Sequence, residues 1–496
     1  MRMAWATPAG TRPGARAAAA ACAVCAGLLA PLPAQTAQTA QALPPQVLAA
    51  LQQAGVPAEA MSVAVHDAAS GKPVLLWQEK RPSNPASLTK LVTTYAALDR
   101  LGPAWSWVTP VWLGGAVKDG VLEGSLFIKG SGDPRLVVER LWLMLRRLQQ
   151  LGVREIRGDI VLDGSAFAAA DAAAGDFDGE PLRPYNVRPA ALLFNFRSVL
   201  YTFVPDAAAG VARVLVEPAL DGTQVDATVP LAGGPCDDWR AALRAGFEPG
   251  RARFAGSFPA ACGEQTWALA DPQPASYDAR LLETLWRGLG GVLHGVVREG
   301  PAPTDAKPAF ELRSPPLAEV VRDINKMSNN LMAQQLFLTL AREAAPREPA
   351  TPDAARALLM RWVAQRSGGF GGAGDELVID NGSGLSRATR ISALRFARLL
   401  LLAGDSTVMS ELMSSLAISG LDGTLRRSRA APGRAHLKTG SLRDVVAVAG
   451  YVLVPDGRRY VLVAVVNHPN AAAARPALDS LVEWVMSPRG QIALRR

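Results

Sequence analysis

Histidine, cysteine and lysine are scarce in this chain, and aromatic residues make up only 6% of it. The four histidines are scattered, and no group of histidine, cysteine and acidic residues has the spacing of metal ligands. We therefore expect neither a metal nor an organic cofactor. Basic and aromatic residues do not interleave, so the net charge of +8 does not indicate nucleic-acid binding. With 49% hydrophobic and 19% charged residues over 496 positions, the chain is long enough for about three folded domains.

The N-terminus is typical of a secretory signal peptide. Arg2, Arg12 and Arg16 precede a short apolar core at residues 17–29, which is too short to span a membrane. We expect residues 1–34 to be removed during export to the periplasm. The mature chain would then carry no lipid or transmembrane anchor.

Cys236 and Cys262 are the two cysteines outside this leader. In an oxidising compartment, an isolated pair most simply forms a disulfide that closes a local loop. Two buried thiols remain the alternative, and mapping of free thiols distinguishes the two states.

Only eight of the 52 basic residues are lysines, and one of them stands three positions after Ser87. No other serine of the chain has a lysine at this spacing. Pro85 suits the first position of a helix that runs to Gly102, so Ser87 and Lys90 share one face about one turn apart. A neutral lysine can take the proton of a serine hydroxyl, whereas arginine stays protonated. The pair is a candidate nucleophile and base, although such a pair alone is more often a surface feature.

The region from residue 105 to residue 305 is a succession of short strand-like runs and turns, with one amphipathic helix at residues 136–150. Helices and further strands flank it. The strands expected on its two sides are residues 61–66, 73–78, 435–438, 445–454 and 460–466. Because one sheet would combine them, we expect residues 35–104 and 306–496 to form one discontinuous domain. Residues 105–305 would be an insertion of two β-rich subdomains.

Two further motifs carry polar groups suited to catalysis. Ser328-Asn329-Asn330 lies between two predicted helices, where the hydroxyl could relay a proton and the amide could hold a carbonyl or a lysine. Lys438-Thr439-Gly440-Ser441 lies at the end of the strand predicted at residues 435–438. Its lysine supplies charge, its hydroxyls can donate, and its glycine lets a substrate backbone approach closely. Each motif alone is more often a helix cap or a strand end.

Taken together, Ser-x-x-Lys, Ser-x-Asn and Lys-Thr-Gly in this order resemble the signature of penicillin-binding proteins and serine β-lactamases. More than 200 residues separate Lys90 from Ser328, which resembles the D-alanyl-D-alanine carboxypeptidases of the type-4 penicillin-binding-protein class, peptidase family S13. The segments 380–387, 421–425 and 437–442 resemble that family closely as well. Asn329 departs from the pattern, because members often carry Asp there, and we expect little effect on chemistry.

The resemblance implies an α+β fold, with an antiparallel sheet flanked by helices, a helical subdomain and a large, mostly β insertion. It implies a serine D-Ala-D-Ala carboxypeptidase and endopeptidase that forms an acyl-enzyme on Ser87. The residues that the resemblance assigns to catalysis are Ser87, Lys90 and Ser328. Those that it assigns to substrate binding are Asn330, Lys438, Thr439, Gly440 and Ser441.

The implied substrates are peptidoglycan stem peptides, and β-lactam antibiotics are the implied inhibitors. The sequence leaves open whether the protein forms a homodimer. The alternatives are a serine β-lactamase, against which the long insertion argues, and a non-catalytic peptidoglycan-binding protein with a vestigial site. The lifetime of a penicillin adduct separates the first alternative from a peptidase, because a lactamase would release the adduct rapidly.

Overall fold

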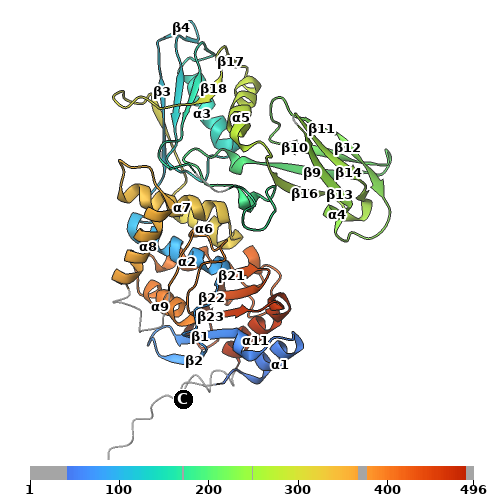
Figure 1. Cartoon of the computed structure of the whole chain (residues 1–496), viewed down its shortest axis with the longest axis vertical. Helices are drawn as coiled ribbons and strands as arrows, with labels where there is room; N and C mark the ends of the chain where they lie inside the picture. Colours follow the sequence, from blue (N-terminus) through green and yellow to red (C-terminus); the bar gives the residue numbers. More distant parts are fainter. Residues whose placement is uncertain (1–41, 170–172, 249, 367–376, 488–496) are drawn as a thin grey trace, which may run out of the picture. The chain divides into compact units, whose positions relative to one another are not determined.

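The computed structural model describes residues 42–169, 173–248, 250–366 and 377–487, and the expected signal peptide at residues 1–34 lies outside them. Across these ranges, no helix has both the length and the apolar character that a membrane crossing requires. Segments from both ends of the described chain form one six-stranded antiparallel sheet (Figure 1). In spatial order its strands are β2 (Pro73–Trp77), β1 (Met61–Asp67), β23 (Arg459–Asn467), β22 (Val445–Leu453), β21 (Ala435–Leu442) and β20 (Ala417–Ile418).

Both faces of this sheet are buried, so alternate residues of its central strands enter two different cores. In β23, the even-numbered residues from Tyr460 to Val466 belong to one core, and the odd-numbered residues from Val461 to Val465 belong to the other. Successive side chains of a strand point to opposite faces. Burial on both faces therefore explains why these strands are hydrophobic at nearly every position.

Helices cover both faces of the sheet (Figure 1). One core contains residues of α1 (Pro45–Gln53) and α11 (Arg475–Met486), which contact each other. The helices that contribute to the opposite core are α2 (Thr89–Leu101), α6 (Leu317–Met327), α7 (Asn330–Ala344), α8 (Pro352–Arg366), α9 (Ala393–Gly404) and α10 (Met409–Ser415). Every residue of α2 from Thr89 to Leu98 is buried. A helix enclosed on all sides carries its polar side chains into the interior, and Lys90 is one of them.

The beginning of α2 differs from the prediction. The sequence predicts an α-helix from Pro85, but α2 begins at Thr89, and a short 3-10 helix, η2 (Ala86–Leu88), precedes it. Ala86 has a φ of 48°, which lies outside the right-handed helical region and so prevents an earlier α-helical start. Ser87 therefore lies on a tight turn before the helix.

The length of β21 also differs from the prediction. The sequence predicts a strand that ends at Lys438, but β21 continues to Leu442. Its pairing with β22 extends as far as Leu442 and Val445, which keeps the polar residues extended. The Lys-Thr-Gly motif therefore lies within a strand and not at its end.

Residues 105–305, the expected insertion, supply most strands of two sheets that share a hydrophobic core with helices α3 (Val138–Gln150) and α5 (Pro274–Gly288). The first contains β18 (Val297–Glu299), β8 (Ile160–Asp163), β6 (Leu126–Lys129), β3 (Val108–Leu113) and β19 (Phe310–Arg313). Because β19 lies beyond residue 305 and pairs with β3, this sheet extends past the expected boundary of the insertion. The second contains β17 (Val292–Leu293), β7 (Glu155–Ile156), β5 (Val121–Leu122) and β4 (Val117–Lys118). Helix α5 is not among the predicted elements, and it begins with Pro274 at a first helical position, where proline is tolerated.

Two more sheets complete the inserted region. One contains β15 (Phe258–Pro259), β12 (Thr228–Ala232), β10 (Val211–Glu217), β9 (Ser198–Asp206) and β16 (Gln265–Ala270). The other contains β11 (Gln224–Val225), β14 (Arg251–Gly256) and β13 (Leu243–Glu248), and a short helix, α4 (Trp239–Ala242), precedes β13.

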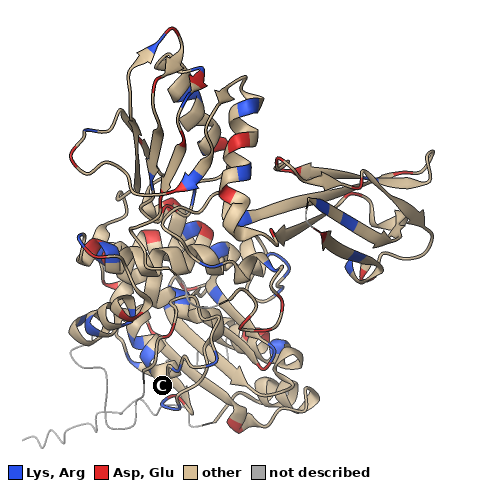
Figure 2. Ribbon diagram, turned by 45° about the horizontal axis from the view of Figure 1, so that its top comes forward, with Lys and Arg blue, Asp and Glu red and all other residues tan. Residues whose placement is uncertain are grey.

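Basic and acidic residues alternate along α5, so that helix has no strip of one charge sign (Figure 2).

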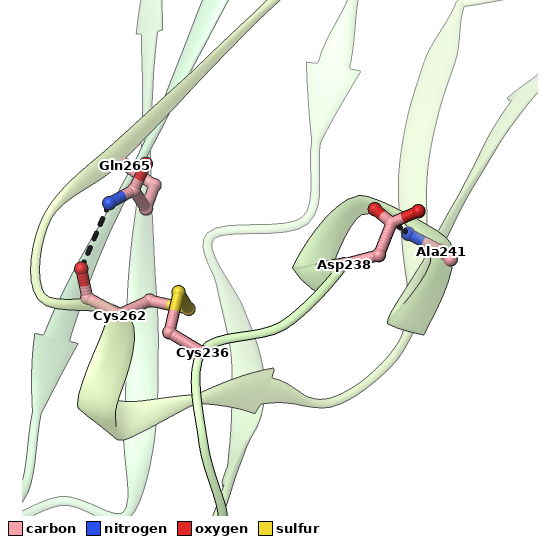
Figure 3. The surroundings of a disulfide bond; sticks show 5 residues. All are labelled: Cys236, Asp238, Ala241, Cys262 and Gln265. Atoms are coloured by element: carbon pink, nitrogen blue, oxygen red, sulfur yellow. Dashed lines mark hydrogen bonds between the residues drawn. A yellow bond between two sulfur atoms is a disulfide. The ribbon is translucent and has the colours of Figure 1, made fainter. Parts of the chain in front are cut away.

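Cys236 and Cys262 form a disulfide in this part of the inserted region (Figure 3). The amide of Gln265 donates to the carbonyl oxygen of Cys262 at 2.9 Å, and the Asp238 carboxylate caps α4 by accepting from the Ala241 N–H. The bridge therefore joins the segment before α4 to the segment before β16.

The inserted region is hydrogen-bonded to α7 through a buried glutamine. The side-chain nitrogen of Gln335 donates to the carbonyl oxygens of Gly132 and Ala190, at 3.3 and 2.9 Å. Its side-chain oxygen accepts from the Ala190 N–H at 3.0 Å. Because Asn330 begins this same helix, α7 connects the inserted region to a predicted site residue.

Candidate active site

Ser87 lies on the turn η2, which the side chain of Asn84 holds in place. The Asn84 side-chain oxygen accepts from the Ala86 N–H at 2.9 Å, and its side-chain nitrogen donates to the carbonyl oxygen of Ser386 at 2.9 Å. Asn467, at the end of β23, bonds both backbone groups of Asn84, at 2.7 and 2.9 Å. A residue typical of turns thus fixes the loop that presents the candidate nucleophile.

The amine of Lys90 lies against the hydroxyl of Ser87. Nζ is 2.9 Å from Ser87 Oγ, 2.5 Å from Asn330 Oδ1 and 2.6 Å from the carbonyl oxygen of Ser383. The Lys90 side chain is fully buried at the start of α2. Residues from three distant parts of the sequence therefore converge on one amine.

Burial lowers the pKa of Lys90 well below its ordinary value of 10.5, and the positive charge of Lys438 lowers it further. Burial also lowers the pKa of Lys438, to about 7. A lysine whose pKa is depressed has a larger neutral fraction at a given pH, and a neutral amine can accept a proton. The electrostatics therefore suit proton transfer from Ser87 to Lys90.

The second motif lies at the junction of α6 and α7. Ser328 ends α6 in the left-handed conformation, with a φ of 57°, and its hydroxyl accepts from Lys438 Nζ at 2.7 Å. Asn329 caps α7, because its side-chain oxygen accepts from the Met332 N–H at 3.0 Å. Asp and Asn are about equally good caps, so either residue can begin this helix.

The third motif lies on β21, directly against the nucleophile turn. A Cβ on Gly440 would lie 2.7 Å from the carbonyl oxygen of Pro85 and 3.3 Å from the Ser87 nitrogen, so only glycine permits this approach. The Thr439 hydroxyl bonds that of Thr424 at 2.8 Å, and Ser441 accepts from Arg475 at 3.2 Å.

One edge of β21 is partly open. On this side, β20 pairs with β21 only at His436 and Leu437. Among the strands of the described residues, none pairs with this edge from Lys438 to Leu442. An extended peptide could therefore bind there as a further strand.

The structure brings the predicted residues together in two groups. Ser87, Lys90 and Asn330 form one hydrogen-bonded group, and Ser328 and Lys438 form the other. The groups are close enough for Lys438 to lower the pKa of Lys90. Thr439, Gly440 and Ser441 line the same strand as Lys438. The disulfide cysteines lie elsewhere in the sequence, in the segments before α4 and before β16.

Three contacts were not assigned by the sequence analysis: the Ser383 carbonyl on Lys90, Thr424 on Thr439, and Arg475 on Ser441. Ser383 and Thr424 belong to the segments 380–387 and 421–425, which resemble the family. That resemblance marks the segments but does not indicate which contacts their residues make. A backbone carbonyl has no side-chain signature, and Arg475 lies far away in sequence. No group of three or more potential metal ligands occurs in the ranges that the structure describes.

Similar proteins include two curated carboxypeptidases. The chain is 28% identical over 443 residues to the D-alanyl-D-alanine carboxypeptidase of Actinomadura sp. (strain R39), with 85% of this chain and 80% of that protein covered. It is 25% identical over 394 residues to the D-alanyl-D-alanine carboxypeptidase DacB of Haemophilus influenzae, with coverages of 77% and 80%.

Solved structures confirm the predicted α+β fold. Penicillin binding protein 4 (dacB) from Haemophilus influenzae superposes with a TM-score of 0.70 at 22% identity, covering 88% of this chain and 99% of that one. The predatory endopeptidase Bd0816 from Bdellovibrio bacteriovorus superposes with a TM-score of 0.52 at 15% identity, with coverages of 86% and 92%.

The model of the D-Ala-D-Ala carboxypeptidase 3 (S13) family matches residues 43–487. Because that match spans nearly the whole described chain, this protein belongs to the S13 family of D-Ala-D-Ala carboxypeptidases.

Proposed function

We propose that this chain is a serine D-Ala-D-Ala carboxypeptidase and endopeptidase that acts on peptidoglycan stem peptides through an acyl-enzyme on Ser87. The observation that carries the proposal is the hydrogen bond of 2.9 Å between Ser87 Oγ and the buried amine of Lys90. Covalent catalysis requires a nucleophile within hydrogen-bonding reach of a base, and it requires further groups that hold the base in place.

In acylation, Ser87 Oγ attacks the carbonyl carbon of the penultimate D-alanine as Lys90 Nζ takes its proton. The carbonyl electron pair moves to the oxygen, where the backbone N–H groups of Ser87 and Ser441 would stabilise the charge. The intermediate then collapses and the C–N bond breaks. The departing nitrogen takes a proton from the Ser328 hydroxyl, which recovers one from the Lys438 ammonium.

Deacylation reverses these proton transfers with water as the nucleophile. A water oxygen attacks the acyl carbon and gives a proton to Lys438, which is neutral after acylation. The bond to Ser87 Oγ breaks, and this oxygen recovers its proton from Lys90. Both lysines thus return to their starting states, and the depressed pKa of Lys438, about 7, suits an amine that must both give and accept a proton.

Substrate binding uses β21. We infer that the stem peptide adds as a strand to the open edge beside Thr439, with its terminal carboxylate held by the hydroxyls of Thr439 and Ser441 and by the charge of Lys438. The amide of Asn330 would hold both Lys90 and the carbonyl group on the acyl side. Gly440 lets β21 approach the turn that carries Ser87, so a peptide paired with β21 would lie close to the nucleophile.

The names of relatives support this choice of substrate and inhibitor. One solved structure holds penicillin binding protein 4 with a novel β-lactam, and another is a Bdellovibrio endopeptidase acylated by penicillin G. We infer that the mature chain acts in the periplasm after cleavage of the leader at residues 1–34. The described residues carry no membrane-spanning helix, which agrees with that location.

Labelled penicillin tests the proposal. Incubation with the full chain should give a long-lived adduct on the peptide that contains Ser87, and Ser87→Ala should give none. Hydrolysis of a D-Ala-D-Ala peptide and of a cross-linked muropeptide should be lost in the same variant. A rapidly released adduct would instead indicate a β-lactamase, and absence of any adduct would indicate a non-catalytic binding protein.

A further inference from the structure

The amine of Lys90 has three hydrogen-bond partners of two kinds. Asn330 Oδ1, at 2.5 Å, and the carbonyl oxygen of Ser383, at 2.6 Å, can only accept. The Ser87 hydroxyl, at 2.9 Å, can also donate. A neutral lysine has two N–H groups and one lone pair. If the N–H groups donate to the two acceptors, the lone pair is left facing the hydroxyl of Ser87.

The Ser383 carbonyl depends on the side chain of Asn381. Asn381 Oδ1 accepts from the Ser383 N–H at 3.1 Å, from the Ser383 hydroxyl at 2.9 Å and from the Gly384 N–H at 3.2 Å. Its Nδ2 donates to the carbonyl oxygen of Leu385 at 2.7 Å. One amide thus satisfies four groups of a tight loop on both sides of the carbonyl that contacts Lys90.

The same loop is packed against the nucleophile turn and against α7. A Cβ on Gly384, where φ is +81°, would lie 1.9 Å from the carbonyl oxygen of Ala86. A Cβ on Gly382, where φ is +69°, would lie 2.7 Å from the ring of Phe337. The Gly382 carbonyl accepts from Thr93 on α2 at 2.7 Å. The loop therefore has little room to move as long as its internal bonds hold.

We propose that Asn381 is a positioning residue for the base: by holding the Ser383 carbonyl on Lys90, it directs the lone pair of the amine toward Ser87. This inference rests on the proposed function and deepens it. It also gives a role to the segment 380–387, which resembles the family without an assigned function. Asn381 does not touch Lys90 and would act only through Ser383.

The proposal predicts a change in the titration of Lys90. The groups that face its amine are Ser87 from η2, Asn330 from α7 and Ser383 from the loop, and the charged group that lowers its pKa is Lys438 from β21. Asn381→Ala would loosen an acceptor that stabilises the ammonium form, so the pKa of Lys90 should fall. Asn381→Asp keeps the acceptor oxygen and adds a negative charge, so the pKa should rise.

The titration can be measured without catalysis. The chain has only eight lysines, so ¹³C-labelling of lysine side chains gives few NMR signals, and Lys90→Met identifies the signal of Lys90. The acylation rate with labelled penicillin is then measured against pH for the wild type and both Asn381 variants. Asn325→Ala is the matched control, because that amide bonds Thr94 and Ser415 in the core and reaches only the backbone carbonyl of Lys90, through Thr94, and not its amine.

The expected results are a lower pKa of Lys90 in Asn381→Ala, a higher one in Asn381→Asp and no change in Asn325→Ala. Acylation at the plateau of the pH profile should fall about tenfold in Asn381→Ala, and its acidic limb should move to lower pH. A plateau that falls with no change in the Lys90 titration would overturn the proposal, because a loop with a purely structural role gives that result. An unchanged titration of Lys90 overturns the positioning role of Asn381, whether or not penicillin acylates the chain. Failure of this proposal can therefore be told apart from failure of the proposed function.

Discussion

Lys438 Nζ lies 2.7 Å from the hydroxyl of Ser328, and this pair joins a strand to the junction of two helices. The two residues are 110 positions apart, and neither belongs to the group formed by Ser87 and Lys90. The site therefore contains two serine–lysine pairs in one small volume. We expect one pair to activate the nucleophile and the other to serve the leaving nitrogen.

Ser328→Ala should slow peptide hydrolysis about 100-fold, because the leaving nitrogen loses its proton donor. The measurement is kcat for release of D-alanine from a D-Ala-D-Ala peptide. The fold should be preserved, since Ser328 is only half-buried and Lys438 keeps its hydrogen bond to the carbonyl oxygen of Thr439. Hydrolysis within threefold of the wild type would remove Ser328 from the proton path.

Lys438→Met should stabilise the protein at pH 7. Burial lowers the pKa of Lys438 from 10.5 to about 7, so between these values the unfolded chain binds a proton that the folded chain does not. That difference destabilises the fold at pH 7 and disappears as the pH rises through 10.5. Each unit of pKa difference corresponds to about 1.4 kcal/mol. The free energy of unfolding, measured in urea for both proteins, should show a gain for Lys438→Met that shrinks toward pH 10. A gain that is the same at both pH values would contradict the depressed pKa.

Gly384→Ala should destabilise the protein by about 2 kcal/mol or more and lower the acylation rate. The new Cβ would lie 1.9 Å from the carbonyl oxygen of Ala86, at a φ of +81°. Gly210→Ala is the matched control, because its φ is also positive, at +65°, but no atom lies within 4 Å of the new Cβ. If the two variants lose the same stability, the contact with the nucleophile turn is not what requires glycine.

Replacing Cys236 and Cys262 together with serine should lower stability by about 3 kcal/mol, because the bridge closes a loop with a sequence separation of 26. The penicillin acylation rate should not change, since the bridge lies in the inserted region. Thermal unfolding and acylation of the double variant, next to the wild type, check both statements. A large loss of acylation in a folded double variant would show that this part of the inserted region supports the active site.

The sheet and most helices could be predicted from the sequence, because strands buried on both faces and helices with apolar stripes leave strong patterns. The ends of the helix and the strand at the site, α2 and β21, could not be predicted. Ala86 adopts a left-handed conformation that no propensity indicates, and pairing with β22 keeps Thr439 to Leu442 extended where small polar residues suggest a turn. Tertiary contacts decide both.

The candidate site was predictable as residue types and not as geometry. The three motifs named Ser87, Lys90 and Ser328, but the contact of the Ser383 carbonyl with Lys90 is a backbone interaction across nearly 300 residues. The depressed pKa of Lys90 comes from complete burial and from Lys438, neither of which the sequence reveals. At Asn329 the structure shows a helix cap, a position that accepts Asn or Asp.

The central claim is that an uncharged Lys90 takes the proton of Ser87. The most direct test is the rate constant for acylation by penicillin in Lys90→Ala and Lys90→Arg, measured across pH and compared with the wild type. We expect both variants to lose at least about 100-fold, because alanine has no base and arginine stays protonated, and the wild-type rate should fall as the pH drops below the depressed pKa of Lys90. Either variant acylating at the wild-type rate would contradict this mechanism.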